Sequence, residues 1–172
     1  MGVPSPADLL GSCSRVALHL EMRDGYDLSD PMLARWRSGH QADPADRESW
    51  WRPWLTVVSD AVERGVLVRR ARIVSEPVSE YIRFEYDVTF TNVAAGEEIR
   101  WLPRRQTTDL ALPGNDFWLF DDATLLVNHF AGDGSFTGGE LVTDPATVAL
   151  CTSAFAAVWE RGVSHERYRL AA

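Results

Sequence analysis

Residues 64–74 read Arg-Gly-Val-Leu-Val-Arg-Arg-Ala-Arg-Ile-Val, and this stretch decides the fold. Upstream, from Trp50 to Arg64, apolar residues recur at intervals of three and four, which predicts an amphipathic helix ended by Gly65. The β-branched residues from Val66 to Val74 predict a strand immediately afterwards. A helix that leads directly into an apolar strand is typical of a sheet covered by helices.

The part of the chain before this unit is expected to be mainly helical. Ser5-Pro6 and Asp30-Pro31 each place a capping residue before a proline, which is a start signal for a helix. The segment from Ser14 to Met22 is interpreted as a further helix. Residues 1–49 are therefore expected to form an N-terminal helical extension, packed on a core of residues 50–172 within one structural domain.

The part after this unit alternates between helix and strand. Ser75-Glu76-Pro77 predicts the start of a helix, and the apolar runs Asp116 to Phe120 and Thr124 to Phe130 predict a hairpin. Asp144-Pro145 predicts the start of a last helix, which Gly162 ends. The order of elements predicts a single α/β domain with a mixed β-sheet flanked by helices.

Composition excludes several classes of chemistry. All 17 of the Lys and Arg residues are arginine, so the chain has no lysine. A Walker-type phosphate loop, a Schiff-base enzyme and a kinase-like Lys–Glu pair all need an ammonium group, and none of them is available. The net charge of −8 opposes direct binding of nucleic acid, because phosphate neutralisation supplies most non-specific affinity.

The remaining composition is that of an ordinary globular protein, with 45% hydrophobic and 24% charged residues. No apolar run approaches the ~18–20 residues of a transmembrane helix, so no membrane association is expected. Cys13 and Cys151 fit neither a metal site nor a disulfide framework. A reducing, cytoplasmic location is the expectation that follows.

Arginines form the most prominent candidate site. Guanidinium groups bind phosphate and carboxylate in a bidentate manner, so several converging arginines would bind a small anionic ligand. The alternative is that they pair with nearby glutamates on a solvated surface. The candidate anion-binding residues are Arg69, Arg70, Arg72, Arg83, Arg104 and Arg105, with Arg100 close to them in the sequence.

A second candidate is a polar site made of Asp116, Asp121, Asp122 and His129. Clustered carboxylates can act in acid–base chemistry, although aspartates in a turn usually cap their own backbone. His129 lies on an otherwise apolar strand, where a place in the core or at an edge is the simpler reading. No zinc-ligand spacing or serine elbow is present, so we expect no metal, no cofactor and no catalytic residue.

Tryptophans also cluster, at Trp50, Trp51 and Trp54. Such a cluster could form a stacking wall for a ligand, although aromatic residues at helical spacing are more typical of a core. Trp50 departs from the inward-facing stripe and, if exposed, would indicate a surface for a partner.

Several long motifs resemble a known family. They are His19 to Asp24 (His-Leu-Glu-Met-Arg-Asp), Arg64 to Tyr81, Ala95 to Arg104 and Asp116 to Asp122. These runs resemble an actinobacterial family of uncharacterised domains, whose members are often encoded beside helix-turn-helix regulators of the Cro/repressor type. The resemblance implies a regulator protein as partner and a role in transcription regulation, and it implies no reaction.

A more distant similarity is to the phospholipase-D-like fold. It is carried by the helix-to-strand step Arg64-Gly65-Val66, by the run Phe117 to Asp122, and by the closing helix between Asp144 and Arg161. Active enzymes of this fold need a His-x-Lys motif, in which His attacks phosphorus and Lys stabilises phosphoryl oxygens. The nearest counterpart, His129-Phe130-Ala131, lacks the lysine, so the resemblance implies a fold without its usual catalytic groups.

These observations favour a non-catalytic regulatory sensor or adaptor that acts with a separately encoded helix-turn-helix regulator. The alternative is an enzyme for a phosphate-bearing or nucleotide substrate, with Arg70, Arg72 and Arg104 as an anion clamp and Asp116 or Asp122 as acid or base. A toxin–antitoxin-like partner role and a homodimer are both compatible with the sequence.

Overall fold

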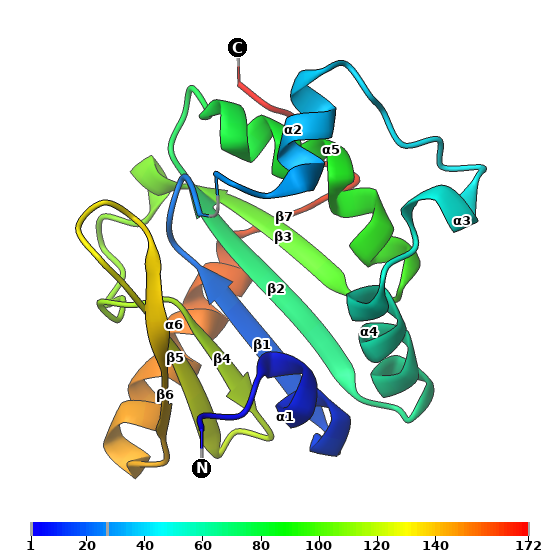
Figure 1. Cartoon of the computed structure of the whole chain (residues 1–172). Coiled ribbons are helices and arrows are strands. Elements are labelled where there is room, and N and C mark those ends of the chain that lie inside the picture. Colours follow the sequence, from blue (N-terminus) through cyan, green and yellow to red (C-terminus); the bar gives the residue numbers. More distant parts are fainter. Residues whose placement is uncertain (1, 27, 172) are drawn as a thin grey trace.

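Strand β2 (Leu67–Val74) forms where the sequence predicts it, and the sheet extends from it in both directions (Figure 1). The computed structural model describes residues 2–26 and 28–171. Seven strands form one mixed sheet in the order β6-β5-β4-β1-β2-β3-β7. The other strands are β1 (Val16–Glu21), β3 (Glu98–Pro103), β4 (Phe117–Phe120), β5 (Thr124–Phe130), β6 (Phe136–Val142) and β7 (Val163–Ser164).

Helices cover both faces of this sheet. Helix α6 packs on one face, and α1, α4, α2 and α5 lie on the other, which we call the front face (Figure 1). The helices are α1 (Pro6–Ser12), α2 (Pro31–Arg37), α3 (Arg47–Trp50), α4 (Pro53–Glu63), α5 (Glu80–Ala94) and α6 (Pro145–Arg161), with a 3-10 turn η1 (Arg104–Gln106). The expected α/β class with a mixed sheet flanked by helices is confirmed.

Strand direction divides the sheet into two halves. Strands β1, β2 and β3 run parallel, whereas β4, β5 and β6 join them through antiparallel pairs. The predicted hairpin between β4 and β5 is present, and both turn residues, Asp121 and Asp122, have a positive φ. The last helix begins after Asp144, whose side chain accepts a hydrogen bond from the Thr147 amide, and its C-cap is Gly162.

The helix expected from Ser14 to Met22 is wrong. This segment contains β1, which lies between β4 and β2 near the middle of the sheet. Five of its six residues are buried, because helices cover both faces of the strand. The strand begins with three apolar residues, so alternation is limited to its second half, and its Ala and Leu residues favour a helix locally; tertiary packing overrides this propensity. Residues 1–49 therefore supply a central strand as well as helices.

Two further helix boundaries differ from the expectation. The helix predicted from Trp50 to Arg64 is divided, because Pro53 starts α4 and holds the preceding Arg52 in an extended conformation. Trp50 is buried and donates its indole N–H to a backbone carbonyl, so it forms no exposed partner surface. Helix α5 begins at Glu80, capped by Ser79 and not by Ser75.

Truncation of Leu20 tests the central position of β1. Leu20 is fully buried, so Leu20→Ala should lower the free energy of unfolding by about 2–5 kcal/mol. Urea denaturation followed by tryptophan fluorescence measures the change. The control is Leu150→Ala on α6, where the side chain is 47% exposed and the expected effect is within about 0.5 kcal/mol. Equal losses in the two variants would contradict the central placement.

Candidate functional site

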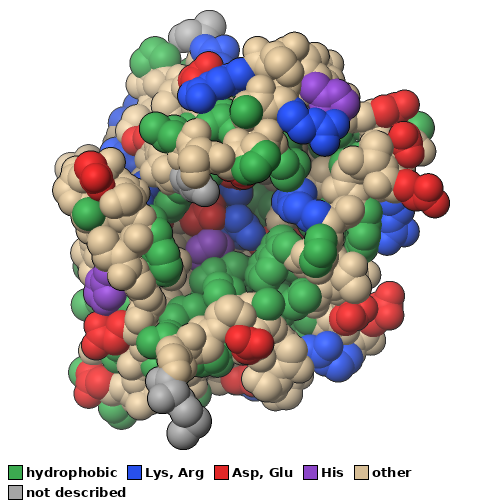
Figure 2. Space-filling model, in the orientation of Figure 1, with side chains coloured by type: hydrophobic (Ala, Val, Ile, Leu, Met, Phe, Trp, Pro, Cys, Tyr) green, Lys and Arg blue, Asp and Glu red, His purple; other side chains and the backbone are tan. Residues whose placement is uncertain are grey.

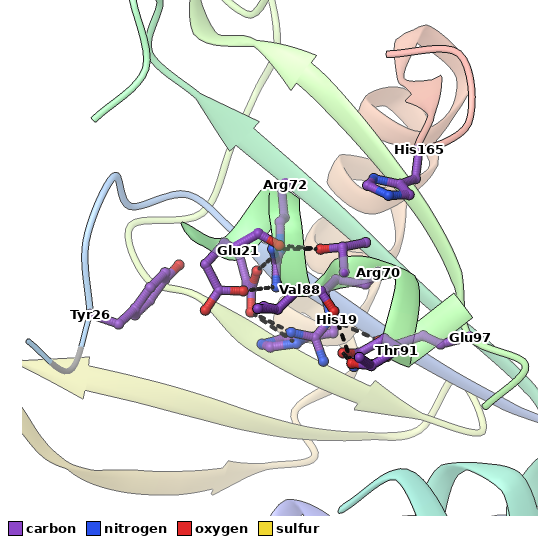
Figure 3. Close-up of polar contacts among 12 residues, drawn as sticks. His19, Glu21, Tyr26, Arg70, Arg72, Val88, Thr91, Glu97 and His165 are labelled. Carbon is purple, nitrogen blue, oxygen red and sulfur yellow. Dashed lines mark hydrogen bonds and ion pairs between the residues drawn. The ribbon is translucent and has the colours of Figure 1, made fainter. Parts of the chain in front are cut away.

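Four polar side chains project from the front face of the two central strands. His19 and Glu21 alternate along β1, as Arg70 and Arg72 do along β2, so all four share one face. All four are buried, which is unusual for ionisable groups. Together with Glu85 of α5 and Glu97 they form what we call the polar centre (Figure 3).

The polar centre lies beneath an open hollow. Figure 2 shows this hollow on the front face, with basic, acidic and histidine side chains at its bottom and hydrophobic side chains around it. The side chains of His19, Glu21 and Arg70 are each about one-tenth exposed, at 9%, 11% and 10%. The polar centre is therefore the floor of a cleft and not a fully enclosed core.

Ion pairs connect the polar centre across three elements. The Glu21 carboxylate lies between two guanidinium groups, 2.9 Å from Arg70 Nη1 and 2.6 Å from Arg72 Nε. Arg70 Nε also contacts Glu97 at 2.7 Å, and Arg72 Nη2 contacts Glu85 at 2.7 Å. Each arginine thus binds two carboxylates, and no carboxylate in the centre lacks an arginine.

A third arginine balances the charge. Arg52 donates to Thr91 and Asn92, both at 3.1 Å, and Asn92 in turn donates to Glu97 at 2.7 Å. The guanidinium groups of Arg52, Arg70 and Arg72 therefore match the three glutamates. With His19 neutral, the formal charge of the whole network is zero.

His19 has a buried ring nitrogen that forms no hydrogen bond with the part of the chain that the structure describes. Its Nδ1 lies 3.6 Å from Glu21 and has no hydrogen-bond partner among the described residues. The ring stacks on Trp118, with centroids 4.1 Å apart and an interplanar angle of 15°. Burial, reinforced by the charges of Arg70 and Arg72, lowers the pKa of His19 well below its usual value. The imidazole is therefore neutral at physiological pH.

A second polar contact borders the centre. Asp116 directly precedes β4 and accepts hydrogen bonds from the Met22 amide, at 2.9 Å, and from the Tyr26 hydroxyl. Burial raises the pKa of Asp116 to about 6, and the nearby charge of Glu21 acts in the same direction. Burial also raises the pKa of Tyr26, so this hydroxyl keeps its proton. Asp116 is thus a carboxyl group that titrates close to neutral pH.

The structure does not bring the predicted arginines together. Arg70 and Arg72 share the polar centre, whereas Arg69 lies on the opposite face, stacked over Trp159 and paired with Glu98 at 2.8 Å. Arg83 is exposed on α5. The remaining two follow β3: Arg104 contacts Asp24 and Arg105 contacts Glu76, each at 3.3 Å.

The predicted carboxylate and histidine set is also dispersed. Asp121 and Asp122 lie by the start of β1, where Asp121 accepts the Arg15 amide at 2.7 Å and Asp122 pairs with the Arg15 guanidinium at 2.9 Å. His129 pairs with Glu140 across the β5–β6 hairpin at 3.0 Å, well exposed to solvent. Only Asp116 borders the polar centre. Across residues 2–26 and 28–171, no cluster of His, Cys, Asp and Glu is suited to hold a metal ion.

Of the six residues of the polar centre, only Arg70 and Arg72 are among the candidate site residues predicted from the sequence. The helix expected from Ser14 to Met22 hides His19 and Glu21, because residues two apart on a helix point in different directions. Treating the same segment as a strand would have placed them on one face, beside the alternating Arg70 and Arg72. The signal was present as two polar-x-polar patterns within apolar strands.

A separate cavity lies on the outer side of α5. It has a volume of about 340 Å³, and we call it the aromatic pocket. Helix α2, the loop after it, α3 and α5 enclose it. Its lining residues are Met32, Arg35, Trp36, His40, Gln41, Ala42, Pro44, Ser49, Trp50, Phe84, Asp87, Val88 and Phe90.

Neutralising Glu21 should destabilise the fold strongly. Glu21→Gln leaves two buried guanidinium groups without their shared carboxylate, and breaking a buried pair costs about 3–5 kcal/mol. The matched control is Glu98→Gln, which removes a half-exposed glutamate from its pair with Arg69 on the same strand β2 and should cost less than about 1 kcal/mol. Urea unfolding of both variants measures the difference. Similar losses would show that the polar centre is no more important than a surface pair.

Asp116 should make stability depend on pH. The carboxyl titrates near 3.9 in an unfolded chain and near 6 in the fold, so the folded state binds more protons between these values. Stability should therefore fall by up to about 3 kcal/mol as the pH rises from 4 to 6. Asp116→Asn keeps an acceptor for the Met22 amide and removes this titration. Unfolding measured from pH 4 to 8 should show a smaller fall for the variant, and identical pH profiles would contradict the assignment.

Comparison with known proteins gives a fold and a family. The chain is similar to TrmBL2, described as an archaeal chromatin protein with a novel mode of DNA binding, with a TM-score of 0.50 and 12% identity over 91% of this chain and 47% of that one. It is also similar to Nuc of Salmonella typhimurium, a phospholipase D family member, with a TM-score of 0.50 and 11% identity over 95% of this chain and 88% of that one.

At these identities the two structures show the fold alone, and the expected phospholipase-D-like fold is confirmed. The chain spans about half the length of TrmBL2. No curated protein matches it.

No helix of the described residues is long and apolar enough to cross a membrane. A family model matches residues 5–170, so the chain belongs to the family described as a domain of unknown function, DUF6879.

Proposed function

We propose that this chain is a non-catalytic regulatory sensor or adaptor, which acts with a separately encoded helix-turn-helix transcription regulator. The observation that carries the proposal is the charge balance of the polar centre. Arg70 and Arg72 lie at the bottom of the cleft, yet each is already bound to two glutamates. A site that transfers phosphate needs cationic groups that face the substrate, and this chain uses these two to hold its own elements together.

The structure also separates Asp122 from the arginines of the hypothetical anion clamp. Arg104 contacts Asp24 beyond the end of β1, whereas Asp122 contacts Arg15 before its start. The hypothesis of an anion clamp with Asp122 as acid or base requires these groups and Arg70 in one pocket, so their placement at opposite ends of a central strand argues against it. With Asp116 in that role, the residues lie closer together, and the clamp is disfavoured because Arg70 and Arg72 are already paired with glutamates.

The choice of partner rests on two similarities. The motifs quoted above resemble actinobacterial domains encoded beside helix-turn-helix regulators. The same fold also makes up about half of TrmBL2, which is described as a DNA-binding protein. Because this chain carries a net charge of −8, we propose that the partner and not this chain contacts DNA.

Co-expression tests this proposal. The chain and the helix-turn-helix regulator encoded nearest to its gene should co-elute in size-exclusion chromatography. Adding the chain should change the affinity of the regulator for its promoter DNA, measured by fluorescence anisotropy. A helix-turn-helix regulator encoded elsewhere in the same genome is the control. If the neighbouring regulator neither binds the chain nor changes its DNA affinity, the proposed function is wrong.

A further inference from the structure

Aromatic rings form the walls of the aromatic pocket, and one positive and one negative side chain also line it. Trp36 packs edge-on against Phe84, with centroids 6.0 Å apart, and Trp50 packs edge-on against Phe90 at 5.3 Å. The indole N–H of Trp36 donates to Asp87 at 2.8 Å, and that of Trp50 donates to a backbone carbonyl at 3.0 Å. Because these polar atoms are satisfied, the walls are fixed in position and offer an apolar surface to a ring.

The positive charge of the pocket is available to a ligand. Arg35 forms no ion pair with any carboxylate in the described part of the chain. Among the described residues, its guanidinium group forms one hydrogen bond, from Nη2 to His40 Nε2 at 2.9 Å, in which the imidazole nitrogen accepts. By contrast, Arg37 on the same helix binds Glu80 through two nitrogens. The remaining donors of Arg35 suit the two oxygens of a carboxylate.

The negative charge of the pocket is only partly used. Asp87 projects from α5 and accepts the Trp36 indole N–H through Oδ2, which leaves Oδ1 able to accept from an ammonium group. A ligand with a carboxylate and no ammonium group would leave the charge of Asp87 uncompensated. A ligand with an ammonium group and no carboxylate would leave the charge of Arg35 uncompensated. Opposite charges in one pocket therefore select a ligand that carries both.

We propose that the aromatic pocket binds a free aromatic α-amino acid. The ring would lie against Trp36, Trp50 and Phe84, the carboxylate at Arg35 and the ammonium group at Asp87. The volume of about 340 Å³ is at the small end of the range of ~300–1,000 Å³ for ligand pockets, which suits one amino acid and not a peptide.

This inference deepens the proposed function, because it names what the sensor would detect. Helix α5 connects the two sites: Asp87 and Phe84 line the aromatic pocket, while Glu85 and Thr89 contact Arg72 in the polar centre. The binding site is inferred from the residues of the aromatic pocket and does not depend on the regulator. It is tested on the isolated chain, without the regulator, so the failure of one proposal does not imply the failure of the other.

Isothermal titration calorimetry tests the ligand class. L-tryptophan, L-phenylalanine and L-tyrosine are the probes, with 3-phenylpropionate and phenethylamine as analogues of phenylalanine that each lack one charge, and L-leucine as an analogue without the ring. At least one of the three aromatic amino acids should bind saturably, and about tenfold or more tighter than the analogues. No saturable binding of any of the three overturns the proposal. Equal binding of phenylalanine and 3-phenylpropionate overturns the assignment of Asp87.

Two substitutions locate the site. Arg35→Gln and Asp87→Asn should each weaken binding about tenfold or more, because each removes one charge-assisted contact. Asp87→Asn keeps a carbonyl oxygen that can accept the Trp36 indole N–H, and Arg35 is exposed, so both variants should fold. Arg37→Gln, on the same helix but outside the pocket, is the control and should bind as the unaltered chain does. Undiminished binding by both pocket variants overturns the proposal.

Discussion

The front half of the fold depends on the Glu21 carboxylate and the two guanidinium groups beside it. Moving each of these ions out of water costs several kcal/mol, and only close pairing offsets that cost. The pairing requires Glu21 of β1 to lie opposite Arg72 of β2, as it does in the parallel ladder. A slip of β1 by one residue would turn Glu21 to the opposite, apolar face, away from Arg70 and Arg72, so burial of the charges specifies the register of the two central strands.

The same ions also position the elements above the sheet. Glu85 brings α5 onto Arg72, and Glu97 holds the start of β3 beside Arg70. One face of α5 is therefore fixed by charge, while its other face forms a wall of the aromatic pocket. A ligand that displaces α5 by a small amount would strain short, buried ion pairs, and such a change would reach the centre of the sheet. The ion pair between Glu85 and Arg72 is therefore the physical link between the aromatic pocket and the centre of the sheet.

Much of this architecture could be predicted from the sequence, and the exceptions are set by packing between segments far apart in the chain. The strand after Gly65, the β4–β5 hairpin and the final helix all carry local signals, namely β-branched residues, turn aspartates and an Asp-Pro start. Strand β1 carries only a short signal, the alternation of His19 and Glu21 with two leucines, and its Leu and Ala residues favour helix. Assigning β1 to a helix concealed His19 and Glu21. The aromatic pocket depends on contacts between α2 and α5, far apart in sequence, which no local pattern encodes.

The absence of lysine takes on a structural meaning in the polar centre. A lysine ammonium group is a point charge, whereas a guanidinium group is planar and directs five N–H donors along fixed lines. Arg70 and Arg72 use this shape to bind carboxylates from two different segments of the chain each. A lysine in either position would hold these carboxylates less rigidly. Because the buried arginines are committed in this way, the proposed recognition of a ligand carboxylate uses Arg35, which lines the aromatic pocket and has no carboxylate partner among the described residues.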